Sequence, residues 1–307
     1  MSHSHTTKLK RGLWSSRFGF IMASAGSAIG LGNIWKFPYI TGMHGGGAFV
    51  LFFIFCIITV GIPLMISEMI IGRHTRKDPV GAFRELKGGW WVLTGWLGVI
   101  AGFMILSYYC VIAGWAVDYL WLSLSGMFTR QHANEVPQIF GDLLSSDLSQ
   151  LFWQAVFMGM TILIVIGGVK SGLEKANKVM MPILFLILVT LAGLGITSSG
   201  GVKAMEFLFT PDWSKLDPPA MLEALGHAFF SLSLGMGAML TYGSYADEET
   251  SIPKVAITVS LMDTLVALLS GLAIFPIVFT YGMEPAAGPG LVFKTLPVLF
   301  SQMPGGT

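Results

Sequence analysis

The residues with the clearest capacity for chemistry lie inside apolar segments. Asn33 follows three glycines in the apolar run A-G-S-A-I-G-L-G-N-I-W-K-F-P at residues 25–38. A buried amide side chain needs hydrogen-bond or ion partners. Each glycine costs a helix roughly 1 kcal/mol relative to alanine, so this run predicts a helix that opens midway. Open backbone at membrane depth is tolerated only where protein buries it or a polar cavity adjoins it. We therefore expect a binding site in this segment.

A second apolar segment is interrupted in the same way, by F-F-S-L-S-L-G-M-G at residues 229–237. Paired interrupted segments in two halves of a chain are typical of a transporter's binding site. A half-helix that begins near Leu31 and Gly32 would point free N–H groups at an anion such as a carboxylate. The freed carbonyls are hard oxygen ligands that suit hard cations. The alternative is that these glycines only let helices pack closely.

The elements that position these segments are membrane helices. Of 307 residues, 53% are hydrophobic and 11% are charged, whereas soluble domains average about 25% charged. Apolar runs long enough to cross a bilayer of about 30 Å predict seven spans, near residues 15–42, 47–71, 90–124, 151–169, 177–198, 220–244 and 254–281.

The distribution of positive charge predicts which ends face the cytoplasm. With a cytoplasmic N-terminus, thirteen of the 18 Lys and Arg residues fall in inside segments, which the positive-inside rule favours. Segment 73–89 then predicts a short amphipathic helix at the cytoplasmic face. Segments 125–150 and 199–219, which are rich in Pro, Asp, Ser and Gly, are expected to be external loops.

Several long motifs resemble the neurotransmitter:sodium symporter family, from about Arg11 to Thr307: R-G-L-W, A-G-S-A-I-G-L-G-N-I-W-K-F-P-Y, G-G-G-A-F, G-I-P-L-M-I-S-E and F-F-S-L-S-L-G-M-G-A-M-L-T-Y-G-S-Y. The resemblance is greatest to bacterial members that carry bulky hydrophobic amino acids. It implies an all-α integral membrane protein of the LeuT-like fold, built from two inverted five-span repeats with spans 1 and 6 unwound at mid-membrane.

The resemblance also implies the residues of the site. The first sodium ion is expected at the Ala28 carbonyl, Asn33, Ser231 and Asp263, and the second at the carbonyls of Gly26 and Ile29. The substrate is expected at Ala28, Leu31, Gly32, Ile105, Tyr109, Phe230, Ser231, Ser233 and Met236. The carboxylate would meet the N–H groups of Leu31 and Gly32 and the Tyr109 hydroxyl. Phe230 would act as a lid. Gating roles are implied for Arg11, Trp14, Lys36, Tyr245, Gly172 and Pro182.

Four positions depart from the family's pattern. Asp263 stands where many members have Asn, and Ala267 stands where chloride-dependent members have Ser. An ionised carboxylate beside a bound cation replaces the charge that an anion would bring, so we expect chloride-independent transport; the alternative is a protonated, structural Asp263. Lys36 replaces an Arg and cannot form a forked carboxylate pair. His227 stands where Gln is common.

The pattern of the family continues for about five more spans after Thr307. We expect a cytoplasmic tail (1–14), a first five-span repeat (15–198), an external loop (199–219) and a partial second repeat (220–307). The predicted function is sodium-coupled import of hydrophobic L-amino acids across the bacterial cytoplasmic membrane, with no organic cofactor and no nucleic-acid partner. Alternatives are a truncated fragment that does not transport, and a membrane enzyme using Asp263 or His227, for which no catalytic motif is found. Glu68, an intramembrane carboxylate, is expected in a structural network near the site.

Overall fold

The computed structural model describes residues 13–127, 136–285 and 290–302, and these form helices without a strand. The elements of the first half are α1 (Arg17–Ala28), η1 (Gly32–Lys36), α2 (Phe37–Met43), α3 (Gly47–Cys56), η2 (Ile57–Gly61), α4 (Ile62–Thr75), α5 (Pro79–Leu86), η3 (Gly89–Trp91), α6 (Val92–Leu124), α8 (Val136–Ser145) and α9 (Asp147–Ile166). The remaining elements are η4 (Val169–Glu174), α10 (Lys175–Ile196), α11 (Gly201–Phe209), η5 (Trp213–Lys215), α12 (Pro218–Ser231), α13 (Ala238–Gly243), α14 (Ile252–Thr280) and α15 (Leu291–Gln302).

Most of the predicted spans are present as long apolar helices. Five helices in the described part of the chain are long and apolar enough to cross a membrane, and the pair Arg17–Ala28 and Gly32–Met43, bent by 45°, makes a sixth if it counts as one span. The expected span at 220–244 is divided between α12 and α13, which residues 232–237 separate. Neither piece is long enough alone, because the second interruption removes more than a full turn of helix.

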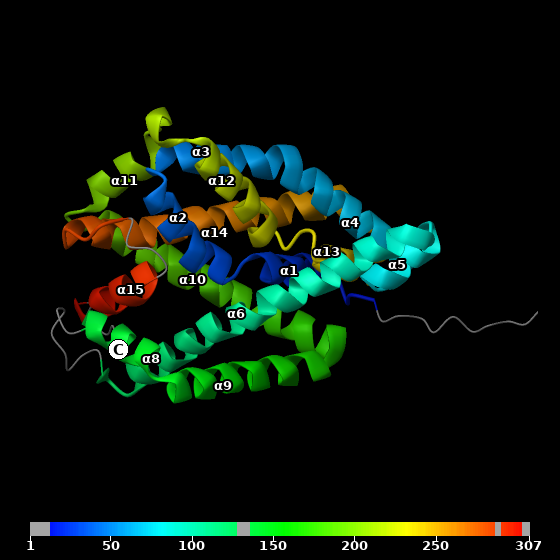
Figure 1. Cartoon of the computed structure of the whole chain (residues 1–307), viewed down its shortest axis with the longest axis horizontal. Helices are drawn as coiled ribbons and strands as arrows, with labels where there is room; N and C mark the ends of the chain where they lie inside the picture. The colour runs from blue at the N-terminus through cyan, green and yellow to red at the C-terminus, as the bar shows by residue number, and fades with distance from the viewer. Residues whose placement is uncertain (1–12, 128–135, 286–289, 303–307) are drawn as a thin grey trace, which may run out of the picture.

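Helix α14 forms the centre of the arrangement. In Figure 1 it runs through the middle of the molecule, with α3, α4 and α12 on one side and α6 and α9 on the other. In the most apolar 18-residue stretch of α14, 61% of the residues are buried inside the protein, whereas no residue is buried in the corresponding stretch of α9. A helix that is apolar all round and has no buried window faces lipid, so α9 lies at the periphery.

The two ends of the molecule carry different short helices. Helix α5 and the start of α1 lie at one end, and α8, α11 and α15 lie at the other (Figure 1). Helix α5 of segment 73–89 therefore shares an end with the start of α1, and helices α8 and α11 share the opposite end. Helix α5 confirms the expectation of a short helix within 73–89.

The segments expected to be external loops at 125–150 and 199–219 contain short helices in their described parts. The first segment contains α8 and the start of α9, and the second contains α11 and η5. The polar residues that suggested loops act as helix caps: Ser146 accepts a hydrogen bond from Ser149 N–H at 3.4 Å, and Asp217 accepts one from Ala220 N–H at 2.8 Å. Such caps satisfy the free N–H groups at helix starts, so they mark helix boundaries here.

Candidate functional site

The first interruption separates α1 from η1. Ile29 adopts an extended backbone, with φ −80° and ψ 114°, so the chain leaves the helix directly after α1. The N–H of Gly30 donates to Asn33 Oδ1 at 3.2 Å, and the N–H of Leu31 donates to the Tyr109 hydroxyl at 3.1 Å. In a continuous helix these N–H groups would bind the carbonyls four residues earlier, those of Gly26 and Ser27.

This diversion leaves oxygen atoms for other partners. The Gly26 carbonyl loses its helical donor, and so does the Ile29 carbonyl, because the Asn33 N–H donates to the Gly30 carbonyl at 3.1 Å. The Ser27 carbonyl instead accepts a hydrogen bond from the Ser233 hydroxyl at 2.7 Å. Gly26 and Ile29 are the two positions that the sequence proposes for a second cation, and their freed carbonyls fit a hard ion.

The second interruption spans residues 232–237, between α12 and α13. Ser233 has φ 55°, and Gly235 and Gly237 have φ 79° and 76°. The left-handed region costs a residue with a side chain roughly 1–2 kcal/mol and costs glycine almost nothing. The Gly235 N–H donates to Glu68 Oε1 at 2.7 Å. Glu68 therefore holds the open backbone of this interruption, which is the network role expected from the sequence.

A buried polar cluster joins the two interruptions. Asn33, Ser231 and Asp263 are 0%, 1% and 0% exposed. The Asn33 amide donates to Asp263 Oδ1 at 2.8 Å and to the Ser231 hydroxyl at 3.1 Å. The Ser231 hydroxyl lies 2.8 Å from both carboxylate oxygens. Three elements, η1, α12 and α14, thus bring together oxygen-bearing side chains that lie up to 230 positions apart.

The cluster has the chemistry of a small hard-cation site. A carboxylate, a hydroxyl and an amide oxygen are the ligand types that hard cations prefer. The Asn33 amide nitrogen now faces the carboxylate, where it supplies positively polarised hydrogens. An amide exposes its oxygen instead after a half-turn of the side chain, since its two ends are nearly isosteric. As a cation ligand Asn33 would give up the hydrogen bond that its oxygen accepts from the Gly30 N–H, so cation binding would also change the first interruption.

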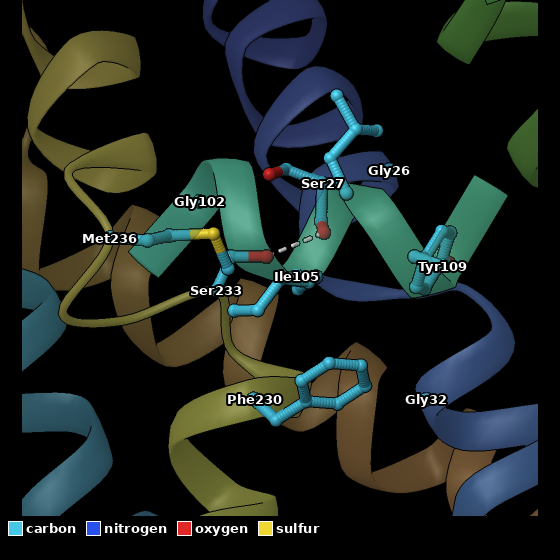
Figure 2. A pocket seen from close by; sticks show the side chains of 11 residues that line it. Gly26, Ser27, Gly32, Gly102, Ile105, Tyr109, Phe230, Ser233 and Met236 are labelled. Carbon is cyan, nitrogen blue, oxygen red and sulfur yellow. Dashed lines mark hydrogen bonds between the residues drawn. The ribbon is translucent and has the colours of Figure 1, made fainter. Parts of the chain in front are cut away.

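A cavity of about 320 Å³ lies next to this cluster (Figure 2). This volume is at the lower end of the range of small-molecule pockets. Seven of the predicted substrate residues line the cavity, and Gly26, Ser27, Gly102 and Leu106 line it as well. The predicted residues in the lining are Ala28, Gly32, Ile105, Tyr109, Phe230, Ser233 and Met236.

Two predicted substrate residues lie outside the lining. Leu31 turns its side chain to a separate apolar cavity, which Trp35 and Phe293 also line, and only its N–H reaches the Tyr109 hydroxyl. Ser231 belongs to the polar cluster. The signal that the sequence reading missed is helical spacing: Gly102 and Leu106 lie seven and three residues before Tyr109, on the same face of α6.

Phe230 lines the cavity and has aromatic and cationic neighbours. Its ring centroid lies 6.4 Å from that of Tyr109, and the Lys36 ammonium lies 4.9 Å from the Phe230 centroid, a cation–π distance. Lys36 forms no ion pair within the described residues. His227 is 0% exposed and stacks between Phe37 and Phe230 at 5.9 and 6.4 Å. Lys36 and His227, two of the departures from the family's pattern, therefore both contact the Phe230 ring.

At the opposite end, the N-terminal segment packs on the chain that follows the second interruption. The Trp14 N–H donates to the Tyr245 carbonyl at 3.1 Å, and its indole N–H donates to the Tyr242 carbonyl at 3.0 Å. The Trp14 ring stacks on Tyr242 at 5.5 Å with an interplanar angle of 3°. Arg11, the remaining predicted gate residue here, lies outside the described residues.

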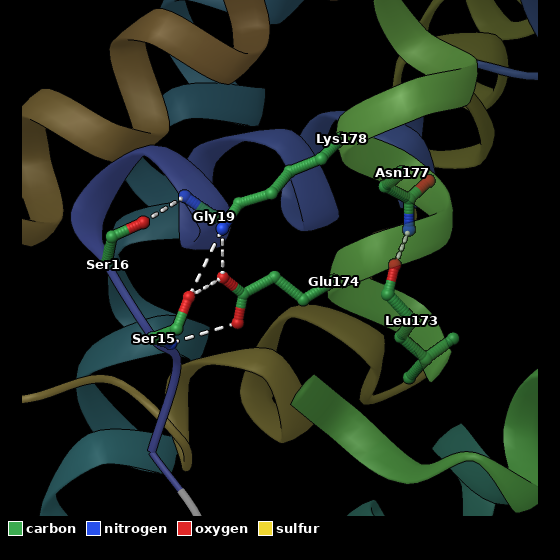
Figure 3. A network of polar contacts seen from close by, with 7 residues as sticks. All are labelled: Ser15, Ser16, Gly19, Leu173, Glu174, Asn177 and Lys178. Carbon is green, nitrogen blue, oxygen red and sulfur yellow. Dashed lines mark hydrogen bonds and ion pairs between the residues drawn. The ribbon is translucent and has the colours of Figure 1, made fainter. Parts of the chain in front are cut away.

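A polar network ties the same segment to the start of α10 (Figure 3). Glu174, 1% exposed, accepts hydrogen bonds from the Ser15 N–H at 2.9 Å, from the Ser15 hydroxyl and from the Lys178 ammonium at 2.6 Å. Gly172 lies in the π-helical stretch η4, and Pro182 lies inside α10. The sequence reading did not single out Glu174, since a Glu–Lys pair at i, i+4 usually marks an exposed helix face.

Comparison with known proteins agrees with this geometry. The model of the sodium:neurotransmitter symporter family matches residues 11–140 and 141–307. The sodium-dependent transporter YhdH of Bacillus subtilis is 44% identical over 295 residues, which cover 96% of this chain and 65% of YhdH. A sodium-dependent transporter of Haemophilus influenzae is 35% identical over 312 residues, which cover 98% of this chain and 68% of the relative.

The structure is also similar to that of MhsT in complex with L-phenylalanine, with a TM-score of 0.93, 46% identity and coverage of 97% of this chain and 68% of MhsT. The two interrupted spans and the similarity to MhsT define a membrane protein of the all-helical, LeuT-like fold. The chain belongs to the sodium:neurotransmitter symporter family. It spans about two thirds of the length of these relatives.

Proposed function

We propose that the protein is a sodium-coupled symporter that imports hydrophobic L-amino acids by alternating access. The observation that carries the proposal is the buried Asn33–Ser231–Asp263 cluster beside the cavity. Its side chains come from both interrupted spans, so a cation bound there would stabilise one arrangement of the two spans. A ligand shifts such an equilibrium by its differential affinity for the two states.

The substrate carboxylate is proposed to bind at the start of η1. The N–H groups of Leu31 and Gly32 and the Tyr109 hydroxyl lie there, where the positive end of a half-helix favours an anion. A carboxylate in this position adjoins the first sodium site, so sodium and substrate should bind cooperatively. The apolar lining formed by Ile105, Phe230 and Met236 suits a hydrophobic side chain. The relative MhsT, whose structure contains L-phenylalanine, supports this class of substrate.

Two sodium ions are proposed, one at Ala28, Asn33, Ser231 and Asp263, and a second that the carbonyls of Gly26 and Ile29 begin to surround. We propose chloride-independent transport, because the Asp263 carboxylate supplies a negative charge within the first site. The N-terminus is proposed to be cytoplasmic on the positive-inside rule. Trp14, Tyr245, Gly172 and Pro182 would then form the cytoplasmic gate together with Arg11, and Lys36 and Phe230 the external one.

Binding and uptake should be measured separately, since binding needs the site and uptake needs a complete transport cycle. Purified protein is expected to gain thermal stability from L-leucine or L-phenylalanine in sodium but not in potassium, because a ligand that binds the folded state stabilises it. In liposomes an inward sodium gradient should drive uptake of labelled L-leucine. Replacing chloride with gluconate should leave uptake unchanged. Stabilisation by glycine alone would contradict the substrate class, and equal stabilisation in potassium would contradict sodium coupling.

A further inference from the structure

Three glycines lie on the face of α6 that adjoins the second interruption. Gly95, Gly98 and Gly102 are spaced by three and four residues, which places them on one side of a helix. A Cβ at Gly95 would lie 2.7 Å from the Pro79 carbonyl oxygen, and one at Gly98 would lie 3.3 Å from the Gly235 carbonyl oxygen. At these two positions, close backbone contacts account for the glycine.

Gly102 differs from the other two. The nearest atom to a Cβ built there is Met236 Cβ at 3.9 Å, an ordinary van der Waals distance. Packing within the protein therefore leaves room for a larger residue, although glycine inside a helix costs roughly 0.5–1 kcal/mol relative to alanine. Gly102 lines the cavity of about 320 Å³, next to Met236 (Figure 2). The space that a side chain at position 102 would fill is cavity space.

The position of Gly102 along α6 shows which part of a ligand it faces. Tyr109, whose hydroxyl meets the Leu31 N–H, lies seven residues later, and a rise of 1.5 Å per residue places the two about 10 Å apart along the helix. Ile105 lies between them on the cavity wall. A substrate with its carboxylate at Tyr109 therefore directs the far end of its side chain toward Gly102.

We propose that Gly102 is a specificity-determining residue that leaves room for an aromatic side chain at the far end of the cavity. The inference rests on the proposed function, because it assumes an amino-acid substrate whose carboxylate lies at Tyr109. Met236 closes the same end with a flexible, unbranched side chain that adapts to rings of different size. Amino acids with large apolar side chains, including Phe and Trp, are the class that this geometry accepts.

The test is Gly102→Ala in purified full-length protein, with competition by L-leucine, L-phenylalanine and L-tryptophan against a labelled amino acid in sodium. One methyl group in an apolar pocket changes affinity by about tenfold or more. We expect the variant to lose about tenfold in affinity for phenylalanine and tryptophan, and to change less than about twofold for leucine. An unchanged ratio of leucine to phenylalanine affinity, or an equal loss for all three ligands, would overturn the inference.

Gly159→Ala is the matched control. Gly159 lies inside α9, and nothing lies within 4 Å of a Cβ built there, so this variant gains the same helix propensity away from the cavity. It should keep the order of affinities of the unmodified protein. If the unmodified protein binds no amino acid in sodium, the proposed function fails. If it binds them and Gly102→Ala leaves their ratio unchanged, only the role of Gly102 fails.

Discussion

The two interrupted spans open in different ways. The first interruption takes up only residues 29–31, none of which has a left-handed backbone. Its diverted N–H groups find side-chain partners in Asn33 and Tyr109. The second takes up residues 232–237 and contains three left-handed residues, and Glu68 holds it from outside.

This difference indicates a division of roles. The short interruption frees backbone N–H and carbonyl groups at a 45° bend between α1 and the helix that follows, which is what binding an ion and a carboxylate requires. The long interruption forms the cavity wall near Ser233 and Met236. Asp263 connects the two, because it accepts hydrogen bonds from Asn33, just after the first interruption, and from Ser231, just before the second.

The largest effect is expected when this connection is removed by Asp263→Ala. The Asp263 carboxylate accepts hydrogen bonds from Asn33 and Ser231, and each hydrogen bond to a charged group contributes about 1.5–3 kcal/mol, so its loss corresponds to roughly a hundredfold or more in binding. Sodium should raise the thermal unfolding temperature much less than in the unmodified protein, because only the proposed second site remains, and sodium-driven uptake should be lost. Thermal unfolding of purified protein with increasing sodium measures this directly.

Ser270→Ala is the control for this prediction. Ser270 is buried in the same helix, and its hydroxyl donates to the Val266 carbonyl at 2.8 Å, so the variant also removes a buried polar group from α14 but leaves the cluster intact. It should retain the sodium response. A full sodium response in Asp263→Ala would show that the cluster only connects the spans and binds no ion.

A smaller effect, confined to the first interruption, is expected from Tyr109→Phe. The change removes the hydroxyl that meets the Leu31 N–H at 3.1 Å. Hydrogen bonds to charged groups contribute about 1.5–3 kcal/mol, so amino-acid affinity should fall about 10- to 100-fold. Sodium-dependent stabilisation without amino acid should change little. Competition binding in saturating sodium measures the effect.

Tyr108→Phe provides the matched control, because Tyr108 is adjacent in sequence and 45% exposed and does not line the cavity. It should bind amino acids as the unmodified protein does. If both variants weaken binding equally, the effect comes from α6 as a whole and the proposed role of the Tyr109 hydroxyl is wrong.

The existence of both interruptions could be predicted from sequence, since glycine and polar residues inside apolar runs conflict with an unbroken membrane helix. The length of the second could not, because it depends on Ser233. A serine gives no signal for a left-handed backbone, and only tertiary contacts select it. The same limit applies to Gly102, because Gly95 and Gly98 have the same residue type and the same spacing. Only the structure shows which glycine faces backbone and which faces the cavity.

The short helices α8 and α11 were missed for a different reason. Their segments contain Pro, Asp, Ser and Gly, which occur both in loops and at helix boundaries. A short helix differs from a loop in burying an apolar face. Helix α8 buries Phe140 and Leu143, and helix α11 buries Ala204 and Leu208. The partners that cover these faces, α15 and α14, lie far away in sequence, so local patterns give no indication of them.

The smallest effect is expected at Ser233, where two contributions oppose each other. Its left-handed backbone, φ 55°, costs about 1–2 kcal/mol for a residue with a Cβ, and its hydrogen bond to the Ser27 carbonyl contributes about 1 kcal/mol. Ser233→Ala loses the bond and keeps the strain, so it should be about 1 kcal/mol less stable than the unmodified protein. Ser233→Gly loses both, so it should equal or exceed the unmodified protein in stability. Thermal unfolding of the two variants compares them, and an alanine variant more stable than the glycine variant would contradict a strained second interruption.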